Sequence, residues 1–68
     1  MAHLKKLATE VKEGDTIQSP HTKSYWGIVY LIQQTAKKIT FFVKFTEGDM
    51  LGKEWDYSFM KTTKVTVK

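Results

Sequence analysis

A run of nine residues that is apolar on both faces, with one glycine inside it, most constrains the fold of this chain. In residues 25–33 one alternating set is Trp26, Ile28, Tyr30 and Ile32, and the other is Tyr25, Val29 and Leu31. A strand with two apolar faces is either covered on both sides or part of a strongly bent wall. Gly27 favours the bent wall, because a glycine inside a strand marks a bulge, a corner or the close approach of another backbone.

Four further segments have the pattern of short strands. Residues 16–18 follow a Gly-Asp turn at Gly14, where glycine permits a positive φ. Residues 38–46 and 54–60 alternate between two sets of side chains, and residues 64–68 alternate as a last strand. The residues expected to face inward on the two longer strands are Ile39, Phe41, Val43, Phe45, Trp55, Tyr57 and Phe59.

The N-terminal residues 3–10 fit two local structures. Leu4, Leu7 and Ala8 lie at helical spacing, yet the segment is only about two turns long, which is short for a helix in water. We therefore expect a short helical turn or a lead-in segment before the first strand.

The five predicted strands, joined by connections of a few residues, indicate one domain over residues 1–68. We predict an all-β fold, a small five-stranded SH3-like barrel. An OB-fold also has five strands, but it usually needs longer strands and a helix between the third and the fourth. Residues 47–53 are too few and too rich in glycine to form that helix.

Residues 11–17, which read Val-Lys-Glu-Gly-Asp-Thr-Ile, are followed by Gly27, Ile28, Val29 and Ile32. This pattern resembles the KOW-type SH3-like modules of NusG-type elongation factors and of some ribosomal proteins. The resemblance covers under half of the chain and implies contact with RNA or with RNA polymerase. The layout of the whole chain is also similar to small uncharacterised barrel proteins of bacteriophages, and a phage origin would imply the host cytoplasm as the location.

Charge and composition narrow the class of partner. The chain has a formal net charge of +4, and all eleven of its basic residues are lysines. A lysine meets phosphate as a flexible point charge and lacks the planar fork with which arginine reads guanine. Binding to nucleic acid would therefore depend on phosphates and be weakly sequence-specific. Because the chain lacks cysteine and a long apolar run, we expect a cytoplasmic protein with no membrane partner.

The nine aromatic residues exceed what so small a core can hide. Alternation puts Phe42 on the face opposite to Phe41, next to Lys44, and Tyr25 begins its strand after a loop that contains a lysine. The predicted result is a basic aromatic patch formed by Lys23, Tyr25, Tyr30, Lys37, Lys38, Phe42 and Lys44. The alternative is that residues 3–10 cover Tyr25 and Phe42.

The sequence offers little for catalysis. Its histidines, His3 and His21, lack the spacing of a nucleophile and base or of a metal site. Glu54 and Asp56 belong to the expected solvent face of a strand. We therefore expect no enzyme activity, no catalytic residue, no metal, no cofactor and no small-molecule substrate.

Together these patterns favour a non-enzymatic binding module. The leading expectation is binding to nucleic acid through phosphate contacts, or to a nucleic-acid-handling protein. The alternative is a phage-type module that binds and modulates a host protein without contacting nucleic acid. An exposed alternating edge strand readily pairs with another strand, so we expect a monomer or a weak homodimer.

Overall fold

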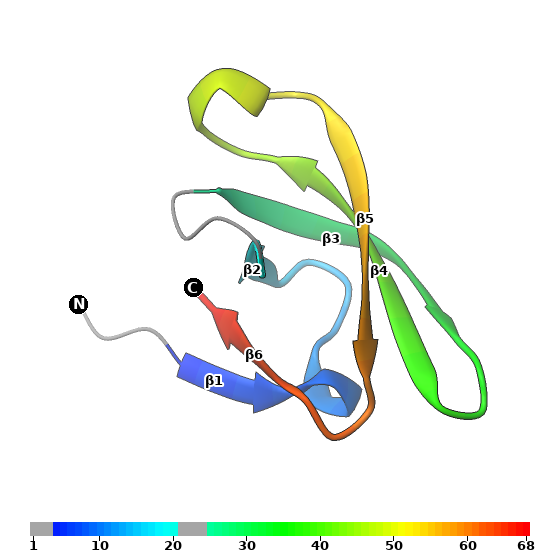
Figure 1. Cartoon of the computed structure of the whole chain (residues 1–68). Coiled ribbons are helices and arrows are strands. Elements are labelled where there is room, and N and C mark those ends of the chain that lie inside the picture. Colours follow the sequence, from blue (N-terminus) through cyan, green and yellow to red (C-terminus); the bar gives the residue numbers. More distant parts are fainter. Residues whose placement is uncertain (1–3, 21–24) are drawn as a thin grey trace.

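The structure, a computed structural model, describes residues 4–20 and 25–68. Their strands form one antiparallel sheet in the order β1-β6-β2-β3-β4-β5 (Figure 1). The strands are β1 (Leu4–Leu7), β2 (Thr16–Gln18), β3 (Trp26–Gln34), β4 (Lys38–Phe45), β5 (Glu54–Met60) and β6 (Lys64–Val67). Within the described residues the helical elements are two 3₁₀ turns, η1 (Ala8–Glu10) and η2 (Gly48–Met50). The all-β prediction is confirmed.

The first strand corrects the predicted count of five strands. β1 pairs with β6 along its whole length, so the sheet has six strands. β6 provides a backbone partner for every residue of β1. This pairing outweighs the helical tendency of the segment, which is too short to form a stable helix on its own. η1 follows directly, and the N–H of Ala8 donates to the carbonyl of Thr63 at 2.8 Å, with Ala8 buried in the core. Of the two structures expected for the N-terminal residues, residues 4–7 therefore form the lead-in segment and not the helical turn.

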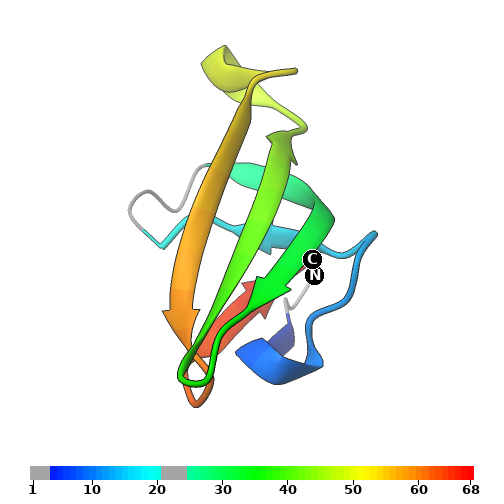
Figure 2. The ribbon, with the colours of Figure 1, turned by 90° about the vertical axis from the view of Figure 1, so that its right-hand side faces the viewer.

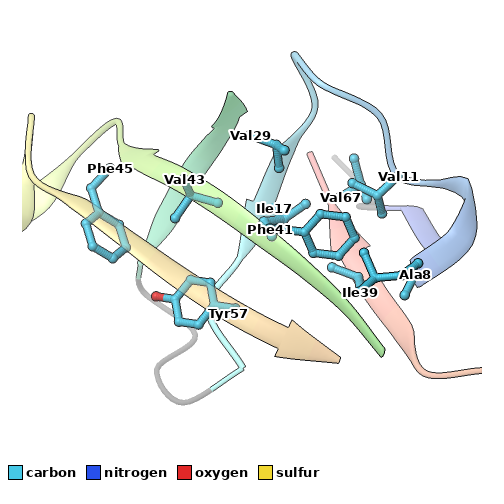
Figure 3. Packing of buried hydrophobic residues seen from close by; sticks show 11 residues of the cluster. Ala8, Val11, Ile17, Val29, Ile39, Phe41, Val43, Phe45, Tyr57 and Val67 are labelled. Atoms are coloured by element: carbon cyan, nitrogen blue, oxygen red, sulfur yellow. The ribbon is translucent and has the colours of Figure 1, made fainter. Parts of the chain in front are cut away.

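The curled sheet encloses one core, and β4 runs through its middle (Figure 3). The inward residues predicted for β4 are all buried, namely Ile39, Phe41, Val43 and Phe45. They share a cluster with residues of η1, of the position just after it and of four other strands, namely Ala8, Val11, Ile17, Val29, Tyr57, Val65 and Val67. Because the sheet curls, β6 lies behind the layer formed by β3, β4 and β5 (Figure 2). Burial of these apolar side chains is the dominant favourable term in folding.

β5 is an edge strand, so fewer neighbouring side chains cover the side chains on its inner face. Tyr57 is buried and Phe59 is half-buried, whereas Trp55 is 54% exposed. Trp55 lies opposite Val43 in the register, but only β4 adjoins the strand there. Trp55 therefore alternates in step with Tyr57 and Phe59 as expected, but its place on the edge strand leaves it exposed.

Gly27 lies where three strands meet. In the register it is opposite Ile17 of β2 and Phe45 of β4. A Cβ at this position would lie 2.9 Å from the Cβ of Val43 and 3.0 Å from its Cγ2. The Val43 side chain is fully buried and has little room to withdraw, so only glycine permits this approach. The sequence favours a bent wall at Gly27, and the structure shows the close approach of the Val43 side chain at this position.

A β-bulge in β3 changes which residues face the core. The register passes from Val29 to Leu31 on β3 while β4 advances by one residue, so Tyr30 is the extra residue. Val29 is buried, whereas Tyr30 and Leu31 are both exposed, and Ile32 packs against the core. The prediction that Ile32 shares a face with Tyr30 is wrong, because simple alternation does not continue through a bulge.

Replacing Gly27 by Ala should lower the free energy of unfolding by about 1 to 3 kcal/mol, because the added methyl group overlaps Val43. Urea denaturation followed by tryptophan fluorescence measures this loss. Gln33→Ala, at an exposed position of the same strand, is the matched control and should change the free energy by less than about 0.5 kcal/mol. Equal losses in the two variants would show that overlap with Val43 is not the cause.

Candidate binding surface

Four apolar side chains gather on the outer face of the sheet, the face turned away from the core. Ile28, Tyr30 and Leu31 of β3 are 39%, 45% and 40% exposed. Phe42 of β4 lies opposite Leu31, and its ring centroid is 6.5 Å from that of Tyr30. Phe42 is half-buried. We call these four residues the outer patch.

The β-bulge creates the outer patch. In a regular strand Tyr30 and Leu31 would point to opposite faces. The extra residue lets both remain outside, next to each other and across from Phe42. The bulge therefore doubles the apolar surface that β3 presents at this point.

Two carboxylates border the outer patch on the side of β5. The Tyr30 hydroxyl donates to Oε1 of Glu54 at 2.7 Å, and Asp56 lies opposite Phe42. The hydrogen bond to Glu54 is the largest cause that raises the pKa of Tyr30 above its ordinary value of 10.0. Desolvation and the negative charges of Glu54 and Asp56 raise it further, because each disfavours the phenolate.

The charge and polarity of the side chains on the outer face change along the strands. At one end of the patch Lys44 lies between Ile28 and Glu54 in the register. Toward the β3–β4 turn the next row is polar and uncharged, with the Thr40 and Ser58 hydroxyls 2.9 Å apart and Gln33 opposite Thr40. Lysines resume only beyond that row. On the side of β4 and β5, the outer patch is therefore bordered by one cation, Lys44, and two anions, Glu54 and Asp56.

The structure divides the predicted basic aromatic patch. Tyr30, Phe42 and Lys44 lie together on the outer face. Lys37 and Lys38 lie at the β3–β4 turn, beyond the uncharged row. The five residues thus form two groups, an apolar one with mixed charge and a basic one without aromatic rings.

Tyr25 and Lys23 stand apart from both groups. Tyr25 packs against the core, with its ring centroid 5.7 Å from that of Phe45, and does not join Tyr30. Lys23 lies outside the described residues. The ring of Tyr30 lies beside Phe42 on the outer face, whereas residues 4–7, which the alternative places over Phe42, pair with β6 at the opposite end of the strand order.

Sequence reasoning missed Ile28 and Leu31 as members of the surface, and it assigned Glu54 and Asp56 only to a solvated strand face. Leu31 was expected opposite to Tyr30, because the alternation shows no bulge. The proximity of Glu54 to Tyr30 depends on the register across three strands. No signal within β3 alone indicates either feature.

In the described residues, no group of three or more His, Cys, Asp or Glu side chains is placed to hold a metal ion. An open pocket of about 150 Å³ is lined by Gln18, Ser19, Pro20, Phe59, Lys64, Val65 and Thr66. This lining contains one titratable side chain, that of Lys64, and no carboxylate or imidazole. His3 and His21 lie outside the described residues.

Comparisons with protein-family models, with curated proteins and with solved structures gave no match to this chain. No helix in residues 4–20 and 25–68 has the length and apolar character needed to cross a membrane.

Phe42→Ala should lower the free energy of unfolding by less than about 2 kcal/mol, because this ring is only half-buried. Phe41→Ala, one residue away and fully buried, should cost about 3 to 5 kcal/mol. Thermal or urea denaturation of the two variants checks the difference. A loss at Phe42 as large as that at Phe41 would place Phe42 in the core and remove it from the outer patch.

The phenol of Tyr30 should titrate above pH 10.0 in the folded protein, and Glu54→Gln should lower its pKa toward that ordinary value. Because the folded-state pKa is the higher one, the contribution to stability is present below pH 10.0 and is lost as pH rises through the folded-state pKa. Ring chemical shifts of Tyr30 against pH measure the titration. An unchanged pKa in Glu54→Gln would contradict the hydrogen bond as its cause.

Proposed function

We propose that this chain is a non-enzymatic, cytoplasmic binding module with an SH3-like barrel, and that its outer patch binds a protein partner. The strand order β6-β2-β3-β4-β5 supports the fold proposal, since it is a meander whose last strand returns beside the first of the five. The short turn at residues 61–63 before β6 also suits that fold. β1 is then an addition at one edge.

The carrying observation is an exposed apolar cluster that lies beside two carboxylates, one of which accepts a hydrogen bond from Tyr30. Ile28, Tyr30 and Leu31 project from one strand, and Phe42 lies beside them. Tyrosine is enriched among the residues that contribute most to protein interfaces, where it supplies apolar area and a hydrogen-bonding group. Such a cluster supports binding to an apolar side chain of a partner.

The position of the carboxylates favours protein over nucleic acid at this surface. A base stacked on Tyr30 or Phe42 would bring its phosphates close to Glu54 and Asp56. Lys44 supplies a single compensating charge at the border. Phosphate-driven binding needs several uncompensated cations, so the outer patch suits nucleic acid poorly.

The same carboxylates determine the chemistry of the partner. A partner that covers the outer patch also removes water from Glu54 and Asp56, and a buried carboxylate requires a charged or hydrogen-bonding partner. Tyr30 already donates to one oxygen of Glu54, which leaves acceptor capacity on that group and on Asp56. A lysine or arginine next to an apolar residue meets both requirements. We therefore propose a basic, amphipathic protein segment as the partner.

Synthetic peptides that alternate leucine with lysine should bind at least about tenfold more tightly than peptides that alternate leucine with glutamate. Amide chemical-shift changes should map to Ile28, Tyr30, Leu31 and Phe42. The double variant Glu54→Gln/Asp56→Asn should lose most of the preference for the lysine peptides. The control Glu13→Gln/Asp49→Asn removes the same amount of charge at other exposed positions and should keep that preference.

Shift changes outside the outer face, or equal preferences in the two double variants, would overturn this proposal. A pull-down from the native host, repeated after nuclease treatment, then tests the natural partner. A direct protein partner persists after nuclease and is lost with Leu31→Ser/Phe42→Ser. A partner that disappears with nuclease indicates a nucleic-acid bridge and counts against direct binding by the outer patch.

A further inference from the structure

We infer that the opposite end of the same three strands is a second binding surface, specific for the phosphate backbone of nucleic acid. It is formed by Lys37, Lys38 and Lys61, which we call the basic end. The N–H of Lys61 donates to the carbonyl of Lys37 at 3.3 Å, and Lys38 lies opposite Met60 in the register. The β3–β4 and β5–β6 turns meet at the lower end of the sheet in Figure 2.

The backbone under the basic end is firmly held. The N–H of Thr35 donates to the carbonyl of Lys38 at 2.8 Å, and the N–H of Lys38 donates to Oγ1 of Thr35 at 3.1 Å. These bonds close the β3–β4 turn, and the contact with Lys61 ties it to the next turn. The three lysine side chains therefore start from fixed positions, which reduces the ordering cost when they meet a ligand.

The charge of the basic end is not compensated within the described residues. Their two ion pairs use Lys6 and Lys68, which lie elsewhere. On β5 the carboxylates occupy the far half of the strand, where Asp56 is opposite Phe42, and the uncharged row of Thr40 and Ser58 separates them from Lys38. On β4 and β5, Lys38 thus lies at one end, whereas both carboxylates lie in the other half, beside Lys44.

The absence of an apolar anchor at the described turn tips identifies the class of ligand. The tips consist of Ala36, Lys37, Thr62 and Thr63, and the exposed large apolar side chains beside them are Met60 and Leu7, which lies opposite Lys64 in the register. A membrane surface or an acidic protein is usually held by several apolar or aromatic groups together with charge. A nucleic-acid backbone is held by charge and by hydroxyl contacts alone, so the basic end fits it best.

This surface is separate from the proposed protein site. The row of Gln33, Thr40 and Ser58 lies between the basic end and the outer patch. Both surfaces can therefore be occupied together, and the chain would connect a protein to nucleic acid. The inference does not depend on the proposed function, because no residue is shared.

The test is fluorescence anisotropy with a short labelled DNA duplex. Three phosphate contacts predict a slope of about −2.7 for log affinity against log salt, which is about 40-fold weaker binding at about 200 mM than at about 50 mM salt. Lys37→Gln/Lys38→Gln/Lys61→Gln should lose most of this salt dependence and bind at least about tenfold more weakly at about 50 mM salt. Lys5→Gln/Lys12→Gln/Lys53→Gln reduces the net charge equally, from +4 to +1, at exposed sites elsewhere and should retain most of the binding.

Equal losses in the two triple variants would reduce the effect to net charge and overturn the inference, as would absence of binding at about 50 mM salt. Tighter binding to anionic phospholipid vesicles than to the duplex would also overturn it. Tyr30→Ser/Phe42→Ser distinguishes the two surfaces. This variant should no longer bind the basic peptides but should still bind the duplex. The two proposals can therefore fail independently of each other.

Discussion

The approach of Val43 to the backbone of Gly27 is the contact on which the rest of the structure depends. Gly27 pairs with β2 on one side and with β4 on the other, so it lies at the point where the two halves of the curled sheet join. Any side chain there would push β4 outward and open the core around Phe41 and Phe45. The single small core of this domain leaves little stability in reserve for such a change.

The bulge at Tyr30, three residues after Gly27, gives β3 a second role. Up to Val29, β3 contributes to the core, and at Tyr30 and Leu31 it contributes two adjacent side chains to the outer face. A bulge costs regular pairing, and it commonly reorients side chains at functional positions. The curl of the sheet and the apolar cluster on its surface are therefore produced within one short stretch of β3.

The sequence predicted the parts of the fold that depend on local alternation. The inward side chains of β4 are an example. This strand pairs with β3 on one side and β5 on the other, so its side chains alternate regularly between the core and the outer face. It did not predict β1, whose structure comes from pairing with β6 and not from its own propensity. It also did not predict Leu31 or Glu54 beside Tyr30, since these positions follow from a bulge and from a register across strands. Lys37 and Lys38, by contrast, are adjacent in the sequence, so sequence reasoning alone placed them together at a turn.

The place of β6 between β1 and β2 has a consequence for how the chain folds as it is made. Val67 pairs with Leu4 on one side and with Ile17 on the other. The hairpins from β3 to β5 join neighbouring segments and can form while synthesis continues, but β1 has no partner until β6 has left the ribosome. Pairings between distant segments form late and slowly, so the first described strand to be made is among the last to be ordered.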